Sequence, residues 1–193
     1  MNYCSECGSQ VELLVPDGDD RPRHVCGACG TIHYRNPKIV VGCIPEWEDR
    51  ILLCRRAIEP RYGLWTLPAG FMETGETSQQ GAARETREEA NARVEVGGLY
   101  TLFNLPHIDQ VYLIFRSRLL DLGFGPGAES LDVELFTESE IPWDAIAFPV
   151  VKETLRLYFR DRRNGGLIQR SGDIVRLGGD IRRYRVEIHG TAV

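Results

Sequence analysis

The feature that most constrains this chain is the segment from Gly70 to Ala92, in which three glutamates recur at helical spacing. Glu85, Glu88 and Glu89 stand at offsets i, i+3 and i+4, so a helix would place their side chains on one face. Three carboxylates this close repel one another unless a cation relieves the repulsion, and Mg²⁺ prefers carboxylate oxygens together with substrate phosphates. The spacing therefore predicts a metal site, although a solvated acidic helix face would show the same spacing.

The residues around this helix are typical of a loop that receives a ligand. Gly70 and Gly75 bracket a tight turn whose backbone can approach a phosphate closely. Arg84 stands four residues before Glu88 and can also reach Glu76 across the loop. A guanidinium group placed there would hold the carboxylates in fixed positions.

The whole segment resembles the Nudix (MutT-like) box, in which a glycine, five residues, a glutamate and seven residues precede Arg-Glu-hydrophobic-any-Glu-Glu-any-Gly-hydrophobic. The residues that match this pattern in register are Gly70, Glu76, Arg84, Glu85, Glu88 and Glu89. Thr86, Asn91 and Ala92 depart from it. None of these three is a metal ligand in the family, and asparagine is next to glycine in its tolerance of a left-handed helix end. We therefore expect the chemistry of the family to be intact.

Two CxxC pairs near the N-terminus predict a second metal site. Eighteen residues separate the pair Cys4 and Cys7 from the pair Cys26 and Cys29, and a glycine follows each pair. Four thiolates at this spacing suit tetrahedral Zn²⁺; a disulfide is the alternative, and the absence of a secretion signal disfavours it. A site closed by four protein ligands is structural, and so small a segment rarely folds without metal.

The net charge and the hydropathy pattern limit which partners the protein can bind and where in the cell it is expected. The net charge of −5 argues against a nucleic-acid-binding surface, which is normally basic. No apolar run approaches the ~18 residues that a transmembrane helix needs, and the first ten residues lack the basic-then-apolar pattern of a signal peptide. We therefore expect a cytoplasmic protein with no membrane or nucleic-acid partner.

The order of the expected elements predicts an α/β fold. Strands are expected at residues 39–44, 51–56, 99–104, 110–119 and 131–136. A capping box at Thr77 predicts the start of the first helix, and apolar residues at helical spacing predict a second helix over residues 148–163. This order is that of the Nudix α/β/α sandwich with a mixed sheet, preceded by a small Cys4 zinc ribbon.

Three parts of the chain are expected: a zinc ribbon at residues 1–36, a Nudix hydrolase domain at 37–163 and a C-terminal extension at 164–193. The extension is rich in arginine and alternating apolar residues, which suits either a hairpin that completes a dimer or a tail that is disordered in isolation. We favour a packed extension and a homodimer.

The resemblance implies metal-dependent hydrolysis of a nucleoside diphosphate linked to another moiety. Cations held by the glutamates would neutralise the pyrophosphate charge and lower the pKa of a water that attacks one phosphorus in line. Glu85 and Glu89 are the leading candidate ligands of Mg²⁺ or Mn²⁺, Glu88 is the candidate for a third ligand or a nearby base, and the resemblance allows the Gly70 carbonyl as a further ligand.

The resemblance also implies supporting catalytic residues outside the metal ligands. Glu76 would orient Arg84, and a glutamate on a downstream loop would act as the general base. Glu129, in the loop sequence PGAES, is the first candidate for this base, and Glu134 on the next strand is the second. An ordinary exposed loop acid is an equal alternative for Glu129.

The substrate is inferred from a longer resemblance. More than four-fifths of the chain, from Cys4 to about Arg163, is similar to the zinc-ribbon FAD and ADP-ribose pyrophosphatases, which implies cleavage of FAD or ADP-ribose to AMP. An NADH pyrophosphatase is an alternative, disfavoured because no Ser-Gln-Pro-Trp-type motif follows the box. A catalytically idle, nucleotide-sensing Nudix domain is another, disfavoured by the intact glutamates. The aromatic residues that could stack on the substrate, each also a candidate core residue, are Phe71, Tyr62, Phe103 and Phe148.

Overall fold

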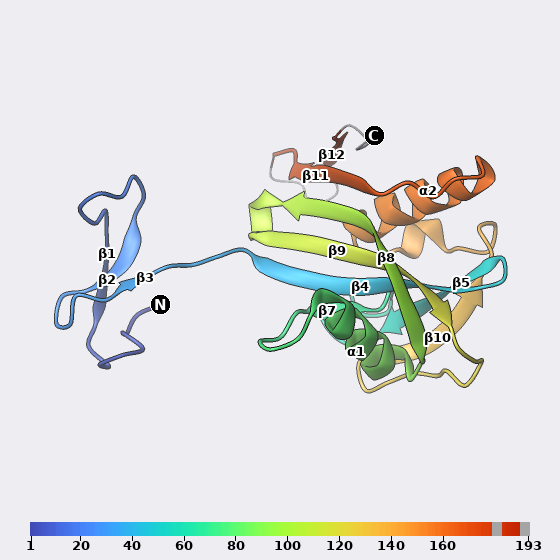
Figure 1. Ribbon diagram of the computed structural model, residues 1–193, viewed down its shortest axis with the longest axis horizontal. Coiled ribbons are helices and arrows are strands. Elements are labelled where there is room, and N and C mark those ends of the chain that lie inside the picture. Colours follow the sequence, from blue (N-terminus) through green and yellow to red (C-terminus); the bar gives the residue numbers. More distant parts are fainter. Residues whose placement is uncertain (179–182, 190–193) are drawn as a thin grey trace. The chain divides into compact units, whose positions relative to one another are not determined.

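The computed structural model describes residues 1–178 and 183–189 of the chain. Contacts between Cα atoms divide the chain into two compact units, Met1–Pro37 and Lys38–Val193 (Figure 1). Each unit has a sheet of its own.

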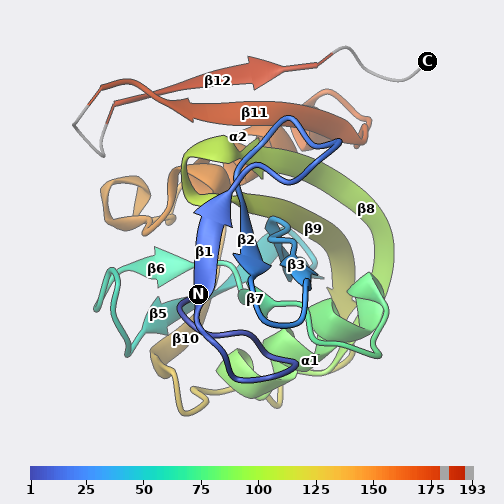
Figure 2. The same ribbon diagram turned by 90° about the vertical axis from the view of Figure 1, so that its left-hand side faces the viewer.

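The N-terminal unit is a three-stranded antiparallel sheet in the order β1-β2-β3 (Figure 2). Its strands are β1 (Val11–Leu14), β2 (Arg23–Cys26) and β3 (Ile32–His33). Both glycines that follow a CxxC pair have a positive φ, 74° at Gly8 and 75° at Gly30. The amide of Gly8 donates to the carbonyl of Cys4 at 3.0 Å, and the amide of Gly30 donates to that of Cys26 at 2.9 Å. Each glycine therefore closes a tight turn that directs the two thiols of its pair inward.

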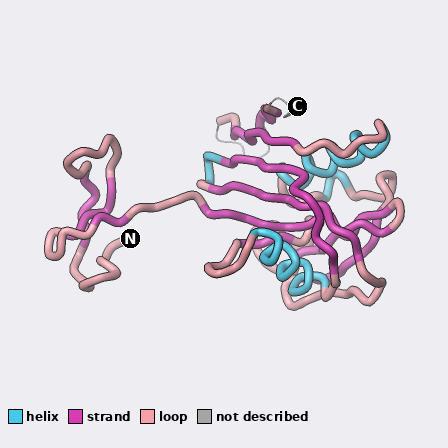
Figure 3. The backbone as a smooth tube through the Cα atoms, viewed as in Figure 1, coloured by secondary structure: helices cyan, strands magenta, loops and turns pink. Residues whose placement is uncertain are grey.

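The larger unit is built on a mixed nine-stranded sheet (Figure 3). The strand order is β10-β5-β4-β9-β8-β11-β12, with β6 paired to β5 and β7 to β4. The pairs β4–β9 and β8–β11 are parallel, and the other pairs are antiparallel. The strands are β4 (Lys38–Trp47), β5 (Arg50–Arg56), β6 (Trp65–Thr66), β7 (Ala69–Phe71), β8 (Val94–Leu105), β9 (Gln110–Leu119), β10 (Ser130–Phe136), β11 (Arg170–Arg176) and β12 (Tyr184–Ile188).

Two α-helices cover opposite faces of this sheet. Side chains of a strand alternate between its faces, and neighbouring residues of β4 belong to different core clusters. Cys43 packs in the cluster that contains Ala82 of α1 (Ser78–Ala90), whereas Ile44 packs in the cluster that contains Leu155 of α2 (Pro149–Arg163). Figure 1 shows the two helices on either side of β4 and β9. The predicted α/β/α arrangement is confirmed.

Two short 3-10 helices, η1 (Pro106–Ile108) and η2 (Trp143–Ala145), complete the elements found among the described residues of this unit. None of the helices in the described part of the chain is long and apolar enough to cross a membrane.

The prediction that the first strand ends at residue 44 is wrong, because β4 continues through Pro45. Glu46 pairs with Ile51 and Trp47 with Arg50, so the hairpin between β4 and β5 extends the strand beyond the proline.

The residues after α2 add a hairpin to the sheet. β11 pairs in parallel with β8, from Arg170 opposite Thr101 to Asp173 opposite Asn104, and β12 pairs antiparallel with β11. Asn104 donates to the carboxylate of Asp173 at 2.8 Å, which fixes this register. The expected extension reaches residue 193, and its residues 179–182 and 190–193 lie outside the described part of the chain.

A buried ion pair ties α2 to this hairpin. Asp161 is 2% exposed and accepts hydrogen bonds from Arg170 Nη2 at 2.6 Å, Arg170 Nε at 3.0 Å and the hydroxyl of Tyr100 at 3.0 Å. Burial acts to raise the pKa of Asp161, but the bonds from Arg170 and Tyr100 outweigh it and lower the pKa below its usual range. The charged carboxylate is therefore the form that the folded chain stabilises.

We expect Asp161→Asn to lower the free energy of unfolding by about 3 kcal/mol at pH 7, because it leaves the guanidinium of Arg170 buried without its counter-charge. A depressed pKa contributes stability that is complete above the unfolded pKa of about 4 and is lost as the pH falls through the folded pKa. The difference between variant and parent should therefore shrink at pH 3. Urea denaturation at both pH values measures it, with Asp144→Asn as the control because the Asp144 side chain is fully exposed. Equal stability of the Asp161 variant and the parent at pH 7 would contradict this account.

Candidate active site

The strand before helix α1 carries the glycine that receives the carboxylates. β7 pairs with β4, with Gly70 opposite Val41, and the chain then passes through a loop into α1. A Cβ atom on Gly70 would lie 2.3 Å from a carboxylate oxygen of Glu85, closer than any side chain allows. Gly70 is therefore required for the carboxylate to lie against the backbone of β7.

Helix α1 begins and ends with the caps that its sequence predicts. The hydroxyl of Thr77 accepts from the amide of Gln80 at 3.2 Å, and the side chain of Gln80 accepts from the amide of Thr77 at 2.8 Å. The predicted capping box is therefore confirmed. At the other end Asn91 is left-handed, with φ 49° and ψ 17°. Between these caps, Glu85 and Glu89 are buried, 9% and 8% exposed, on the side that faces β7.

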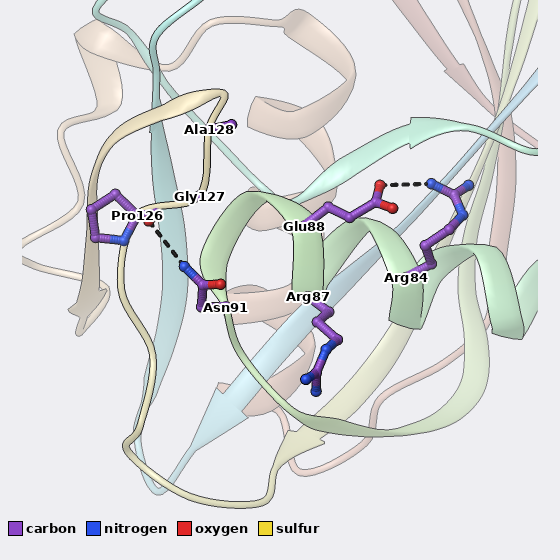
Figure 4. Close-up of a pocket in the computed structure, with 7 residues that line it drawn as sticks. All are labelled: Arg84, Arg87, Glu88, Asn91, Pro126, Gly127 and Ala128. Carbon is purple, nitrogen blue, oxygen red and sulfur yellow. Dashed lines mark hydrogen bonds and ion pairs between the residues drawn. The ribbon is translucent and has the colours of Figure 1, made fainter.

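Arg84 makes the contacts that its spacing predicts. Its Nε and Nη2 donate to the two carboxylate oxygens of Glu76 at 3.0 and 2.8 Å, and its Nη1 donates to Glu85 at 2.6 Å. Nη1 also donates to Glu88 at 3.0 Å, the contact that is drawn in Figure 4. Nη2 also donates to the carbonyl of Phe71 at 3.1 Å. The bond from Arg84 lowers the pKa of Glu76 to about 2. One guanidinium group thus links the loop to three carboxylates of the box.

Glu89 is the most strongly perturbed acid of this cluster. Burial raises its pKa to about 8, and the negative charges of Glu85 and Glu129 act in the same direction, while a hydrogen bond from the amide of Ala69 at 3.2 Å opposes them. Burial is also the main cause that raises the pKa of Glu85. Buried carboxylates that repel one another take up either a proton or a cation. The donor set, two buried carboxylates beside a glycine backbone, therefore fits a hard divalent cation.

Glu129 lies beside this cluster, as predicted for the candidate base. It immediately precedes β10, it lines the same cavity as Glu85, Glu88 and Glu89, and its charge acts to raise the pKa of Glu85 and Glu89. The second candidate, Glu134, lies within β10 opposite Leu53 and is not among the described residues that line the cavity. The structure therefore places Glu129, and not Glu134, with the carboxylates.

A cavity of about 1300 Å³ extends from the carboxylates to the start of α2. Of the four aromatic residues predicted to stack on the substrate, Phe71 and Phe148 line this cavity. Phe103 is 0% exposed in the core between the sheet and α2, so the prediction that it contacts substrate is wrong. Tyr62 is 56% exposed and is not among the described lining residues, so the cavity does not support its predicted contact with substrate.

Sequence reasoning missed several residues of the cavity wall. The guanidinium of Arg56 lies 5.1 Å from the ring centroid of Phe148. Its positive charge partly opposes the rise in the pKa of Glu89 that burial causes. Ile174 of β11 and Tyr184 of β12 also line the cavity. Arg56 follows another arginine at the end of a strand, and nothing in that sequence distinguishes the two. The residues of the hairpin lie some ninety positions beyond the box, and only the pairing of β11 with β8 brings them to the cavity.

The four cysteines of the N-terminal unit converge on one point. Cys4 Sγ lies 3.6 Å from Cys29 Sγ and Cys7 Sγ lies 3.5 Å from Cys26 Sγ, and the four sulfurs all lie within 4.8 Å of one another. Tetrahedral Zn²⁺ with Zn–S bonds of about 2.3 Å holds its sulfurs about 3.8 Å apart. All four thiols are free, so the cluster fits zinc and does not form the alternative disulfides.

Family models and related proteins agree with this geometry. The model of the NUDIX domain matches residues 36–158, and a zinc-ribbon model described as Nudix N-terminal matches residues 2–35. The crystal structure of a NUDIX hydrolase from Nitrosomonas europaea is 59% identical to this chain, with a TM-score of 0.89. The match covers 90% of this chain and 99% of that protein.

Two relatives with named activities are more distant. An ADP-ribose pyrophosphatase of Methanocaldococcus jannaschii is 28% identical over 130 residues, which cover 64% of this chain and 76% of that protein. An NAD-capped RNA hydrolase, NudC, of Photobacterium profundum is 38% identical over 99 residues, which cover 49% of this chain and 34% of the relative. The chain therefore matches about a third of the length of NudC.

Proposed function

The chain belongs to the Nudix hydrolase family, and from that premise we propose that it hydrolyses the pyrophosphate bond of a nucleoside diphosphate linked to another moiety. ADP-ribose or FAD is the proposed substrate, and AMP is one product. The observation that carries this proposal is the meeting of Glu85, Glu89 and Glu129 at one end of a cavity of about 1300 Å³. The ADP-ribose pyrophosphatase among the relatives supports the choice of substrate.

Glu85 and Glu89, with the carbonyl of Gly70, are the residues that would hold Mg²⁺ or Mn²⁺, and Glu88 is the proposed third ligand. When bound, such a cation supplies positive charge against the phosphates and lowers the pKa of water. The side chain of Glu88 also pairs with Arg84 and is 58% exposed, so it can turn between Arg84 and a bound cation.

The remaining charged residues of the cluster hold the proposed metal ligands in place and take a proton from the attacking water. Glu76 holds the guanidinium of Arg84 through two bonds, and Arg84 in turn holds Glu85 and Glu88. Glu129 is the proposed base and accepts the proton of the attacking water. The oxygen of that water forms a bond to one phosphorus, the bond from that phosphorus to the bridging oxygen breaks, and the other phosphate leaves with the bridging oxygen.

The part of the cavity wall formed by Phe148 suits an aromatic ring. The guanidinium of Arg56 lies 5.1 Å from the ring centroid of Phe148, and Tyr184 of the C-terminal hairpin also lines the cavity. A base or flavin ring stacks on an aromatic face, and a neighbouring guanidinium also reaches a phosphate. We therefore assign the moiety that carries the ring to the cavity wall at Phe148.

We expect Phe148→Ala to raise KM about fivefold with little change in kcat, because a lost stacking contact is worth about 1 kcal/mol and acts on the bound substrate as well as on the transition state. Tyr62→Ala is the matched control, since Tyr62 is an exposed aromatic residue outside the cavity lining. Steady-state kinetics with the preferred substrate measures both constants. An unchanged KM in the Phe148 variant would place the ring elsewhere.

A second candidate substrate is an NAD-type dinucleotide, because the NAD-capped RNA hydrolase NudC of Photobacterium profundum is 38% identical to this chain over 99 residues. Phosphate release from ADP-ribose, FAD, NAD⁺ and NADH, coupled to a phosphatase, separates the candidates when it is measured with Mg²⁺, with Mn²⁺ and with EDTA. Metal-dependent turnover of ADP-ribose or FAD supports the proposal. Turnover of NADH alone keeps the mechanism and changes the substrate, and no turnover of any of them favours the idle, nucleotide-sensing alternative.

Three further proposals concern the site formed by the four cysteines, the oligomeric state and the location of the protein in the cell. We propose that Cys4, Cys7, Cys26 and Cys29 bind structural Zn²⁺, which their sulfur separations support. A homodimer and a cytoplasmic location stay predictions. Light scattering on the purified full chain tests the first, and microscopy of a tagged chain tests the second.

A further inference from the structure

The loop that leads to Glu129 is docked on the C-terminal end of helix α1. The amide of Gly125 donates to the carbonyl of Ala90 at 2.8 Å, and the amide of Gly127 donates to the carbonyl of Glu89 at 2.9 Å. The last carbonyls of a helix have no partner within the helix, so these two bonds satisfy groups that would otherwise face solvent. The helix that carries the acidic cluster and the loop that precedes β10 are thus joined by their backbones.

The side chain of Asn91 adds two further bonds to this junction. Its Nδ2 donates to the carbonyl of Pro126 at 3.0 Å and to the carbonyl of Gly125 at 3.3 Å, and Figure 4 shows the side chain directed at the loop. Asn91 stands where the Nudix box has a glycine, which has no side chain to make such bonds. Its backbone is left-handed, with φ 49°, a conformation that asparagine tolerates.

Gly127 shows how close the loop lies to the helix. A Cβ atom at this position would lie 1.7 Å from the carbonyl oxygen of Glu88, so any other residue would force the loop away. Two residues later, the carbonyl of Glu129 accepts from the amide of Ala57 at 2.8 Å, and the amide of Ser130 donates to the carbonyl of Gly127 at 3.1 Å. The chain before Glu129 is therefore held by helix α1 and its carbonyl by Ala57, so the contact between loop and helix is one of the two that set its position relative to Glu89.

We propose that Asn91 is a positioning residue for hydrolysis: through its bonds to Gly125 and Pro126 it holds the loop on helix α1 and so sets where Glu129 lies beside Glu85 and Glu89. This inference rests on the proposed function, in which Glu129 is the base. The competing explanation is that Asn91 only ends the helix. The two explanations differ in what a glycine at this position would do, since glycine ends a helix at least as well but makes no side-chain bond.

The test uses Asn91→Gly and Asn91→Asp in the full chain. Both keep the left-handed helix end accessible, and neither can donate to the two loop carbonyls. We expect each variant to lower kcat by about 10- to 100-fold with KM changed less than about threefold, because a displaced base impairs the reaction and not substrate binding. Asn164→Gly, at the end of α2, is the matched control and should leave both constants unchanged. A role confined to ending the helix predicts no loss of kcat in Asn91→Gly, and that result would overturn the proposal.

Two further readouts test the path through Glu129. Amide hydrogen exchange of the segment 123–129 should become about tenfold faster in Asn91→Gly, since the bonds that hold the loop are lost, whereas exchange within α1 should not change. In a Glu129→Gln background, Asn91→Gly should lower kcat no further, because the two residues act as one unit. Unchanged exchange, or a full additive loss in the double variant, would also overturn the proposal.

Failure of the proposed function has a different signature. A wild-type chain that hydrolyses no dinucleotide with either metal contradicts the proposed function, and the exchange measurement then decides by itself whether Asn91 holds the loop. An active wild-type chain whose Asn91 variants exchange and react as the parent does contradicts only the role of Asn91.

Discussion

Replacing Glu89 with glutamine is expected to lower kcat by roughly three orders of magnitude or more while the protein stays folded. Glutamine has nearly the same shape, and its oxygen can still accept the hydrogen bond that the amide of Ala69 donates at 3.2 Å. It has no charge, however, and a neutral amide is a poor ligand for Mg²⁺ or Mn²⁺. Because burial and the charges of Glu85 and Glu129 raise the pKa of Glu89 to about 8, the fold already favours an uncharged side chain here, and a neutral amide should not destabilise it.

Two measurements separate the catalytic role of Glu89 from a structural one. Steady-state kinetics gives kcat, and circular dichroism with thermal unfolding reports the fold. Glu95→Gln is the matched control, because the Glu95 side chain is 64% exposed on β8 and pairs only with Arg118 among the described salt bridges. A collapsed fold in the Glu89 variant would mean that this acid is structural, and a kcat equal to that of the parent would mean that it is not a metal ligand.

Replacing Cys26 with serine is expected to unfold the N-terminal unit. Cys26 is a member of the cysteine cluster and is 0% exposed, and a structural zinc site contributes about 10–16 kcal/mol of apparent binding free energy. A unit that ends at Pro37 has too little apolar core to replace that contribution. We therefore expect about one zinc per wild-type chain by elemental analysis and none in the variant, with loss of amide protection in the first 37 residues only.

Cys43→Ala is the control for this experiment, since Cys43 is buried in the core beside α1 and outside the cluster. It should retain zinc. Zinc content that survives Cys26→Ser would contradict the assignment of this site. Thiol titration of the unfolded wild-type chain provides an independent check, because a disulfide would remove two of the six thiols that the sequence contains.

The parts of the site that sequence predicted are those that depend on local spacing. Helix α1, its capping box at Thr77 and the contacts of Arg84 with Glu76 and Glu88 all follow from offsets of a few residues within one segment. The turn glycines of the zinc ribbon are equally local. Such features are set by backbone geometry before the rest of the chain is placed, so a sequence motif is sufficient to find them.

The parts that sequence did not predict depend on contacts between distant segments. Phe103 lies on β8, which is covered by α2 on one side, so its burial follows from sheet position and not from any pattern around it. The cavity wall formed by Ile174 and Tyr184 exists only because β11 pairs in parallel with β8. Arg56 meets Phe148 across nearly half of the chain. Parallel pairing and packing of this kind leave little local signal in the sequence.

The measurement that tests the central claim most directly is product analysis of ADP-ribose and FAD hydrolysis in H₂¹⁸O by mass spectrometry, with Mg²⁺ and with EDTA. Our account predicts AMP together with ribose 5-phosphate or flavin mononucleotide, with one ¹⁸O in one of the two phosphates and no reaction in EDTA. Intact substrate in the presence of Mg²⁺ and Mn²⁺, or AMP formed at the same rate in EDTA, would contradict it.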